Sequence, residues 1–471
     1  MGILPWYWRS LSLEGRTGSQ VFQALFHHPK RIGTLLESAA PHSNLKLPLA
    51  RYSLCGGTPR LIQGKPRIWT PAVGEIQPFL CQLLPGVDSG METNSPQENL
   101  PFTGGWLGWL GYDTAWEIEK LPYLKPDTLP FPVAYWYEPD SFAILDHHEQ
   151  ILWLAATEKQ ELDELQNKLE TTPSKALEQS KSLLSCLPAC PSFVTSQVDY
   201  EQAVRQAQKY IYSGDIFQAN LSLRFHTSTT ANSWLIYQAL QTINPSPFAS
   251  YWQTPWGAMM SCSPERLVTL QGTQAETRPI AGTRARGANQ EMEEKLAEEL
   301  ITNVKERAEH IMLVDLGRND LGRVCEWGSV KVDELLTIER YSHVMHLVSN
   351  ITGTLGSHYN AVDLIRALFP GGTITGCPKV RCMEIIEELE PVRRNLFYGS
   401  CGYLDWRGNL DLNILIRTLL YTSTPQGARV WGQVGAGIVA DSDPEREWFE
   451  SLQKAQAQLA ALKLVEGDLG R

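Results

Sequence analysis

Several features that define common protein classes are missing from this chain of 471 residues. No apolar run approaches the roughly 20 residues that a membrane-spanning helix needs, so we expect no membrane partner. The start, from Met1 to Arg9, lacks the charged flank and cleavage site of a signal peptide. Positive charge is scarce, because 41 Lys and Arg face 52 Asp and Glu. The resulting net charge of -11 argues against nucleic acid and anionic membranes, since both would repel the chain.

Paired cysteines and several familiar catalytic motifs are missing as well. The nine cysteines are scattered without a Cys-x-x-Cys pair, and this odd number favours reduced thiols in a cytoplasmic protein. No Ser-His-Asp or Cys-His set for acyl chemistry is evident. The glycine-rich segment Gly371–Lys379 lacks the Gly-Lys-Ser/Thr ending of a nucleotide-binding loop. It could still hold an anion through backbone N–H groups, Thr373 and Lys379.

Polar, turn-forming stretches indicate how the chain is divided. Residues 85–99 are rich in Gly, Ser, Pro, Glu and Asn, and a second polar stretch runs from about 157 to 191. We therefore assign an N-terminal region to residues 1–156, a linker to 157–194 and a catalytic region to 195–465. We expect the two regions to form one intertwined fold.

The local patterns of the catalytic region favour a mixed fold. Helical spacing predicts one helix over Asp199–Tyr212 and one long helix over Gln290–Leu313. Gly399–Asp405 and Leu410–Thr422, joined by a turn, read as a hairpin, and strict alternation would place Arg417 on the same face as Asp411. Strands mixed with long helices in no strict β-α-β order indicate an α+β fold with large antiparallel sheets.

Two pairs of glutamates are spaced to share helix faces. Glu306 and Glu309 lie three residues apart, as do Glu447 and Glu450 in a helix that the capping signature Ser442–Glu445 begins. Together they could form an oxygen cage for Mg²⁺. Spacing alone favours ordinary solvated helix faces, because such pairs are common on helices.

The sequence also contains a lone histidine and a basic segment, each of which can be read as structural or as functional. His346, in the segment Val344–Ser349, is by itself more typical of a structural histidine than of a catalytic one. The segment Glu276–Gly287, an apolar stretch between basic residues, suits a substrate-facing loop or an ordinary turn.

Taken together, these segments resemble one family closely and in the same order along the chain. The family is that of the chorismate-utilising enzymes, which includes anthranilate synthase component I, aminodeoxychorismate synthase component I, and isochorismate and salicylate synthases. The N-terminal region is similar to the family only loosely. The matching segments are Ser263–Glu265, Arg278–Thr283, Lys305–His310, Asp315–Arg323, Val344–Ser349, Pro370–Arg381 and Gly437–Ser442.

The resemblance implies a fold and a metal site. In this family two large antiparallel sheets pack together with helices on the outside. The resemblance also implies that Glu309 and Glu450 lie nearest a Mg²⁺ ion, with Glu306 and Glu447 beside them. It thereby reverses the preference that spacing alone would give.

The resemblance further assigns roles around the substrate. It implies that His346 is an acid/base residue, that Glu265 is the acid that assists departure of the 4-hydroxyl, and that Thr373 neighbours that hydroxyl. Arg417 and the backbone of Gly435, Ala436 and Gly437 would hold the enolpyruvyl carboxylate. Chorismate is a dianion, so Mg²⁺ and Arg417 would supply the positive charge that an acidic protein otherwise lacks. Glu265 must be protonated to act as an acid, so a raised pKa is expected.

Two positions bear on which nucleophile is used. Gln218 stands where the water-using members of the family resemble one another in carrying a lysine base, so ammonia is the expected nucleophile. That implies a separate glutamine amidotransferase partner, because no glutaminase Cys-His region is visible. Ala281 stands where many aminodeoxychorismate synthases have a nucleophilic lysine, and it is similar to anthranilate synthase in this respect.

Other segments divide between the two ammonia-using branches. Leu36, Glu37 and Ser38, together with Pro245, Ser246 and Pro247, resemble the tryptophan-binding pocket of anthranilate synthase. Gln218–Leu221, Ser263–Arg266, Gly371–Thr375 and Gly108–Asp113 resemble aminodeoxychorismate synthase more. We expect amination of chorismate for 4-aminobenzoate and folate synthesis. The alternatives are anthranilate synthesis and, more remotely, a non-catalytic protein that binds chorismate or tryptophan.

Overall fold

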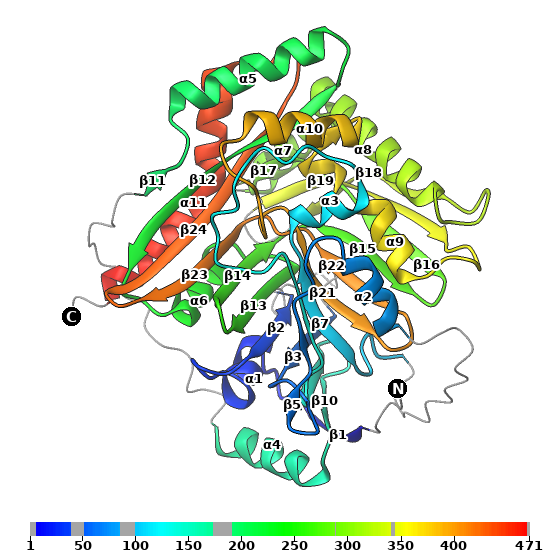
Figure 1. The fold of residues 1–471 in the computed structure, drawn as a ribbon, viewed down its shortest axis with the longest axis vertical. Helices are drawn as coiled ribbons and strands as arrows, with labels where there is room; N and C mark the ends of the chain where they lie inside the picture. The colour runs from blue at the N-terminus through cyan, green and yellow to red at the C-terminus, as the bar shows by residue number, and fades with distance from the viewer. Residues whose placement is uncertain are drawn as a thin grey trace.

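The computed structural model describes residues 6–38, 51–84, 99–172, 191–287, 289–340 and 344–468. This part of the chain contains two large antiparallel sheets, of 12 and 10 strands, and a separate two-stranded sheet formed by β4 (Leu61–Ile62) and β5 (Lys65–Pro66). Helices lie around the sheets (Figure 1). The α+β architecture expected from the sequence is confirmed.

The 12-stranded sheet combines both regions of the chain. Strand β2 (Gly33–Glu37) pairs with β13 (Phe248–Thr254), which places residues of the N-terminal region beside residues of the catalytic region. The regions at 1–156 and 195–465 therefore share one sheet. In order its other strands are β1 (Tyr7–Ser12), β10 (Ile151–Ala156), β9 (Ser141–Asp146) and β3 (Tyr52–Gly56) before β2, and β14 (Gly257–Ser263), β23 (Thr418–Thr424), β24 (Gly427–Ile438), β12 (Gln218–Thr229) and β11 (Ser192–Phe193) after β13, with β20 (Gly376–Cys377) beside β12.

The 10-stranded sheet also mixes early and late segments. Its middle is formed by β21 (Ser400–Asp405) beside β7 (Gly105–Leu110), so that residues almost 300 positions apart are hydrogen-bonded neighbours. The remaining strands, in order, are β17 (Ile280–Ala285), β19 (Val344–Thr354), β16 (Gln274–Arg278), β15 (Arg266–Gln271) and β22 (Leu410–Asn413) before β21, and β8 (Ala134–Tyr137) and β6 (Ile68–Trp69) after β7, with β18 (Lys331–Arg340) beside β19.

The predicted strand over Leu410–Thr422 is wrong beyond Asn413. Strand β22 ends there in the 10-stranded sheet, and the chain crosses to the other sheet before β23 begins at Thr418. Arg417, with φ of 51°, interrupts the alternation, so the face predicted for it does not hold. The crossing places Arg417 between the two sheets instead.

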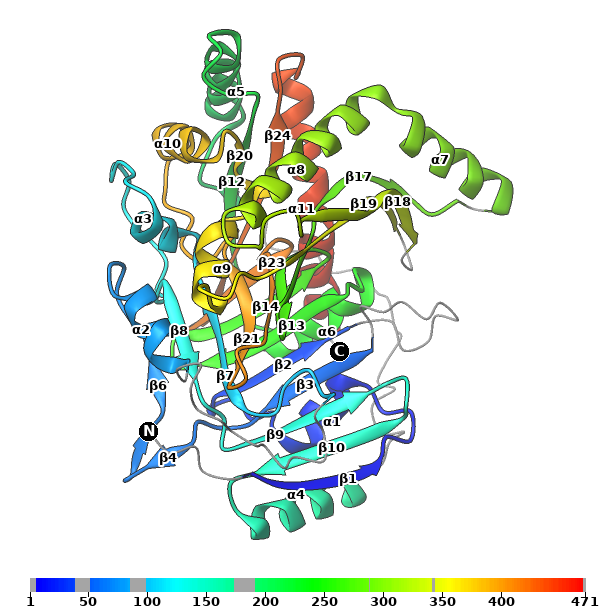
Figure 2. The same cartoon turned by 90° about the vertical axis from the view of Figure 1, so that its right-hand side faces the viewer.

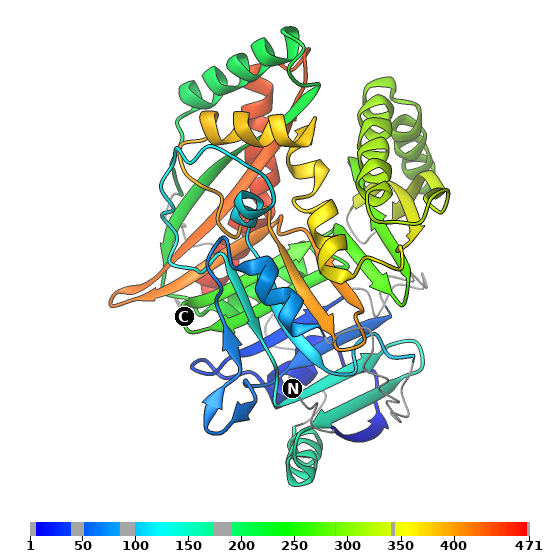
Figure 3. The ribbon, with the colours of Figure 1, turned by 45° about the vertical axis from the view of Figure 1, so that its right-hand side comes forward.

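The predicted long helix over Gln290–Leu313 is also wrong, because it divides into two. Helix α7 (Gln290–Thr302) ends and α8 (Val304–Gly322) begins at Asn303, whose side chain accepts a hydrogen bond from the Glu306 backbone N–H. Asn is a strong N-cap residue and so starts a new helix here. Figure 3 shows α7 and α8 side by side, next to the edge strand β17.

Two other predicted helices are confirmed. Helix α5 (Gln197–Tyr212) begins after Ser196, which caps it, and α11 (Pro444–Asp468) begins after Asp443, whose carboxylate accepts from the Arg446 N–H. The remaining helices are α1 (Gly18–Leu25), α2 (Ile76–Leu83), α3 (Ala115–Ile118), α4 (Lys159–Thr171), α6 (Ser233–Ile243), α9 (Ala361–Leu368) and α10 (Lys379–Leu389), with short 3₁₀ turns η2 (Tyr112–Thr114) and η3 (Gly372–Ile374).

Part of the predicted linker at 157–194 is ordered structure. Helix α4 buries Leu162, Leu165 and Leu169 against α1 and β10, below the sheet in Figure 2. Residues 173–190, and the predicted polar stretch at 85–98, lie outside the described residues. The domain boundaries remain a prediction.

The hydrophobic core has two main parts. One fills the space between the sheets and is rich in aromatic side chains, with Trp109 of β7 against Trp252 of β13 at 5.8 Å between ring centroids. The other lies between the 12-stranded sheet and helices such as α1, α5, α6 and α11. In the described part of the chain no helix is long and apolar enough to cross a membrane.

Candidate active site

Four of the predicted site residues come together where the chain passes between the sheets. Glu265 lies between β14 and β15, His346 lies on β19, Thr373 lies on η3, and Arg417 lies at the crossing before β23. The positive charge of Arg417 acts on both Glu265 and His346, lowering the pKa of each. Elements from distant parts of the sequence therefore converge on one polar site.

Glu265 is held as a neutral acid. Its side chain is 5% exposed, and burial raises its pKa to about 8, because a carboxylate loses its hydration there. The neighbouring Thr373 hydroxyl, the Ile280 backbone and Arg417 act in the opposite direction without cancelling the effect of burial. At neutral pH Glu265 therefore carries a proton that it can donate.

The cavity in front of Glu265 contains the glycine-rich turn. Glu265, Gly371, Gly372 and Thr373 line it together with Ile414, which precedes the crossing. The Thr373 hydroxyl oxygen is buried beside the Glu265 carboxyl. The cavity thus has a proton donor and a hydroxyl on one wall.

His346 is fully buried and neutral. Burial, and then the charge of Arg417, lower its pKa to about 3, while the Gly282 backbone acts in the opposite direction. Across the ladder His346 pairs with Thr283, at a bulge where Gly282 has φ of 62°. A neutral imidazole can accept a proton, and the bulge directs the backbone of Gly282 to it.

Arg417 is placed to bind an anion. In the described part of the chain its side chain donates to the neutral amide oxygen of Asn244, at 3.3 Å. Burial lowers the pKa of Arg417, although the nearby Cys262 and Glu265 raise it. A guanidinium remains charged after such a shift, so the buried positive charge favours a carboxylate ligand.

The α8 carboxylates face β12 and β17. Glu309 accepts a hydrogen bond of 2.7 Å from Gln218 Nε2, and Glu306 forms an ion pair of 2.8 Å with Arg284. The second oxygen of Glu306 and the amide oxygen of Gln218 are buried without a partner. Oxygen donors of this kind fit a hard cation such as Mg²⁺.

The α11 carboxylates have separate partners. Glu447 is buried and accepts from Ser442 at 2.7 Å, whereas Glu450 is exposed and pairs with Lys454 at 2.9 Å. Within the described residues no three His, Cys, Asp or Glu side chains gather as a metal-binding group. The four predicted ligands are therefore not brought together here, and magnesium stays a prediction.

The predicted backbone site at Gly435–Gly437 lies on β24, paired with β12 from Ser222 to Asn220. Added to Gly437, a Cβ atom would stand 2.3 Å from Gln218 Nε2 and 3.3 Å from Glu309 Oε1. A Cβ atom at this position would therefore displace the end of the Gln218 side chain, and glycine lets β24 lie close to Gln218 and Glu309 without that displacement. Ala436, between the two glycines, is fully buried.

The buried side chain of Lys379 forms an ion pair and a hydrogen bond with other residues of the protein. Its ammonium group donates to Asp320 at 2.7 Å and to the Leu368 carbonyl at 2.9 Å, and both side chains are buried. Asp320 lines the cavity in front of Glu265. The sequence motifs included Asp320 but gave no signal that it would pair with Lys379, since ion pairing of this range depends on the fold.

A second cavity, of about 200 Å³, includes part of the predicted tryptophan pocket. Leu36, Glu37 and Pro247 are among its lining residues, whereas Ser38, Pro245 and Ser246 are not. The carboxylate of Glu37 accepts hydrogen bonds from α1 and α6, and Ser38 and Ser246 are buried. Three of the six predicted residues therefore meet at this cavity.

Comparison with known proteins agrees with the geometry. The chain matches the family model for chorismate binding enzymes over residues 77–460. It is 63% identical over 466 residues to an anthranilate synthase component I-like protein of Synechocystis sp. (strain ATCC 27184 / PCC 6803 / Kazusa), an alignment that covers 98% of this chain and 93% of the relative. It is also 45% identical over 433 residues to aminodeoxychorismate synthase component 1 of Bacillus subtilis (strain 168), covering 88% and 90% of the two chains.

A solved structure gives the same result for the fold. The crystal structure of anthranilate synthase component I from Streptococcus pneumoniae TIGR4 superposes with a TM-score of 0.72 at 31% identity, covering 89% of this chain and 94% of that one. The converging acid, histidine and arginine, the family match and these relatives lead to one conclusion. The chain belongs to the family of chorismate-binding enzymes, within its anthranilate and aminodeoxychorismate synthase group.

Proposed function

We propose that this enzyme replaces the 4-hydroxyl of chorismate with an amino group and keeps the enolpyruvyl ether, giving 4-amino-4-deoxychorismate for 4-aminobenzoate and folate synthesis. The observation that carries the choice of nucleophile is the Gln218–Glu309 hydrogen bond of 2.7 Å. An amide at that position cannot take a proton from water as a lysine base could. Ammonia needs no such base because its lone pair is already available at alkaline pH.

The leaving group is served by Glu265. Its raised pKa keeps it protonated at neutral pH, so it can donate that proton as the C4–O bond breaks and water departs. The Thr373 hydroxyl beside it is placed to orient the same oxygen. The cavity wall therefore provides the acid and a hydrogen-bonding neighbour.

Separate groups would bind the two carboxylates of the substrate. Arg417, with the backbone of Gly435–Gly437, binds the enolpyruvyl carboxylate through its buried charge. Glu306 and Glu309 on α8 would supply oxygen ligands to Mg²⁺, and Glu447 and Glu450 on α11 would join them by leaving their present partners Ser442 and Lys454. When bound, Mg²⁺ would neutralise the ring carboxylate and stabilise the charge that develops in the ring.

Anthranilate synthesis is the second candidate, and Ala281 favours it. Many aminodeoxychorismate synthases carry a lysine at this position, but here Ala281 is buried on β17 opposite Leu347. In that reaction neutral His346 would accept a ring proton as pyruvate leaves. The 45% identity to the Bacillus subtilis aminodeoxychorismate synthase supports the first candidate.

The cavity at Leu36 and Pro247 would bind tryptophan, and calorimetry on the purified chain can check this binding.

Ammonia would come from a separate glutamine amidotransferase subunit. Glutamine-dependent turnover should require the amidotransferase, whereas ammonium-dependent turnover should not. Turnover with glutamine by this chain alone would contradict the assigned partner.

A product assay tests the proposal. The purified chain is incubated with chorismate, Mg²⁺ and ammonium at alkaline pH, and products are separated and identified by mass spectrometry. A product that retains the enolpyruvyl group, and that an added lyase converts to 4-aminobenzoate, is expected. Anthranilate with released pyruvate would refute it in favour of the second candidate.

A carboxylate variant distinguishes an enzyme from a binding protein and tests the metal site. Glu309→Gln should abolish most Mg²⁺-dependent turnover, because a neutral amide is a poorer cation ligand. Glu298→Gln, on the exposed face of α7, is the matched control and should leave turnover unchanged. Wild-type protein that binds chorismate without any turnover would favour the non-catalytic alternative.

A further inference from the structure

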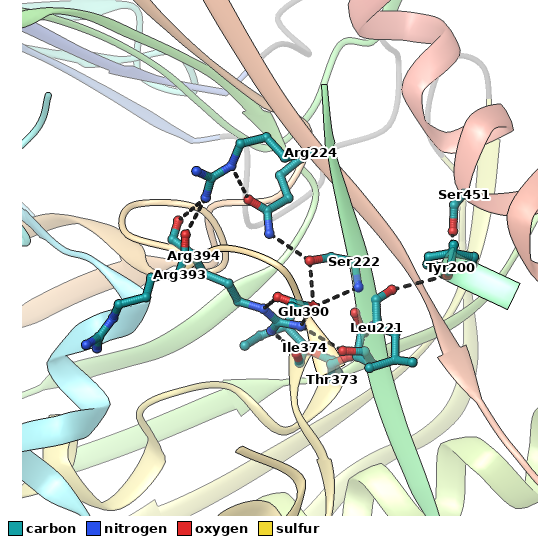
Figure 4. A network of polar contacts seen from close by, with 12 residues as sticks. Tyr200, Leu221, Ser222, Arg224, Thr373, Ile374, Glu390, Arg393, Arg394 and Ser451 are labelled. Atoms are coloured by element: carbon teal, nitrogen blue, oxygen red, sulfur yellow. Dashed lines mark hydrogen bonds and ion pairs between the residues drawn. The ribbon is translucent and has the colours of Figure 1, made fainter. Parts of the chain in front are cut away.

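A buried ion pair lies directly behind the glycine-rich turn. Glu390 is the C-cap residue directly after α10, and Arg394 follows four residues later; their side chains are 6% and 1% exposed. Arg394 binds both oxygens of Glu390, at 2.6 and 2.9 Å (Figure 4). The rings of Tyr112 and Tyr398 lie 4.7 and 4.6 Å from the guanidinium. Burying two charges costs solvation free energy, and only well-formed hydrogen bonds between them offset that cost. The geometry of this pair is therefore tightly constrained.

The remaining N–H groups of Arg394 reach the turn and β12. Nη1 donates to the Ile374 carbonyl at 2.8 Å, and Nη2 donates to the Asn220 carbonyl at 2.7 Å. Asn220 in turn donates from its side chain to the Thr373 carbonyl at 3.3 Å. Two consecutive carbonyls of η3, at Thr373 and Ile374, are thus held by one small cluster.

Glu390 extends the cluster to both strands at the site. It accepts from the Ser222 backbone and hydroxyl on β12, at 2.8 and 2.7 Å. Gln433 of β24 donates to the same Ser222 hydroxyl at 2.7 Å. Strand β12 begins at Gln218, and β24 contains Gly437, so the cluster connects the turn to the strands on which the proposed substrate and metal sites are built.

We propose that Arg394, backed by Glu390, is a positioning residue that holds the Gly371–Thr375 turn so that the Thr373 hydroxyl stays beside the Glu265 carboxyl. The inference rests on the proposed function for its catalytic consequence. Arg394 itself acts through the turn: its hydrogen bonds go to Glu390 and to two backbone carbonyls. A planar guanidinium can serve these acceptors together because its five N–H groups form a rigid fork.

The first test is Arg394→Lys, which keeps the positive charge but loses the fork. Misplacement of a reacting group by about 1 Å can cost about 100-fold, so kcat should fall roughly 10- to 100-fold while KM for chorismate changes less than about threefold. The control is Arg60→Lys, which alters another buried Arg–Glu pair, with Glu138 at 2.7 Å, in the N-terminal region. Both variants should lose thermal stability, but only Arg394→Lys should lose kcat.

A double-mutant cycle separates positioning from general destabilisation. If Arg394 acts through Thr373, then Arg394→Lys in a Thr373→Val background should lower kcat by less than about threefold, because the hydroxyl is already gone. Fully additive losses would overturn the proposal. Should Arg394→Lys fail to give soluble protein, Asn220→Ala takes its place, since it removes the bond to the Thr373 carbonyl.

A titration of Glu265 that requires no turnover tests the positioning role of Arg394 separately from the proposed function. The carboxyl stretch of Glu265 can be titrated by difference infrared spectroscopy, with Glu265→Gln as the reference. Both Arg394→Lys and Thr373→Val should raise the pKa of Glu265, because the neighbouring hydroxyl lowers it. An unchanged titration in folded Arg394→Lys refutes the positioning role. Absence of chorismate turnover in the wild type would instead refute the proposed function alone.

Discussion

The neutral carboxyl of Glu265 has a consequence for stability that can be measured without substrate. Its pKa rises from 4.5 to about 8 on burial. Between these values the folded protein keeps a proton that the unfolded chain releases. Stability from this group is therefore fully present below pH 4.5 and is lost as the pH rises through about 8.

The size of the effect follows from the shift. One pKa unit corresponds to about 1.4 kcal/mol, so the wild type should lose about 5 kcal/mol between pH 4.5 and pH 8 through this residue. Glu265→Gln has nearly the same shape but cannot ionise, so it should not lose this stability. For a chain of this length, about 5 kcal/mol corresponds to roughly 5 °C in Tm.

The assay is the difference in Tm between Glu265→Gln and the wild type across pH 5 to 9. The Tm of the variant relative to that of the wild type should increase steadily as the pH rises, and this increase should continue until the pH passes the pKa of about 8. Glu298→Gln, which changes an exposed glutamate, should show no such trend. A flat difference for Glu265→Gln would refute the conclusion that burial holds Glu265 protonated. In the enzyme assay the same variant should lose about 100-fold or more in kcat, as expected for removal of a general acid.

Three further changes test other parts of the site. Arg417→Met should raise KM for chorismate by about 10- to 100-fold, because a charge-assisted hydrogen bond is worth about 1.5–3 kcal/mol; an unchanged KM would contradict carboxylate binding by Arg417. Lys379→Met should lower the free energy of unfolding by about 3–5 kcal/mol, because Asp320 is left buried without its partner; chemical denaturation checks this, and a loss confined to KM would instead indicate direct substrate contact. Gly437→Ala should displace Gln218 from Glu309 and raise the Mg²⁺ concentration needed for half-maximal activity, since the new Cβ would stand 2.3 Å from Gln218 Nε2; unchanged Mg²⁺ dependence would contradict this.

Short-range features were predictable from the sequence. The helix predicted over Asp199–Tyr212 is α5, and the Ser442–Glu445 signature placed the start of α11 to within one residue, although Asp443 rather than Ser442 caps it. Both predictions were possible because helical spacing and a cap involve only residues close in sequence. The α+β class followed from strands and helices in mixed order, and the family motifs gave the acid, the histidine and the arginine. These conclusions depend on residues that are close in sequence or on patterns that relatives share.

Other features were decided only by tertiary structure. The alternation after Leu410 is the same whether a strand stays in one sheet or crosses to another, so the sequence could not show that Arg417 lies between the sheets. The partner of Lys379 is 59 residues away, and Arg394 reaches Asn220 across 174 residues. A glutamate in an unfolded chain is ionised at pH 7, whereas Glu265 stays protonated near pH 7 because folding removes the hydration of its carboxylate. The sequence thus determined which chemical groups the chain possesses, and the packing of the two sheets decided their partners, their burial and hence their protonation states.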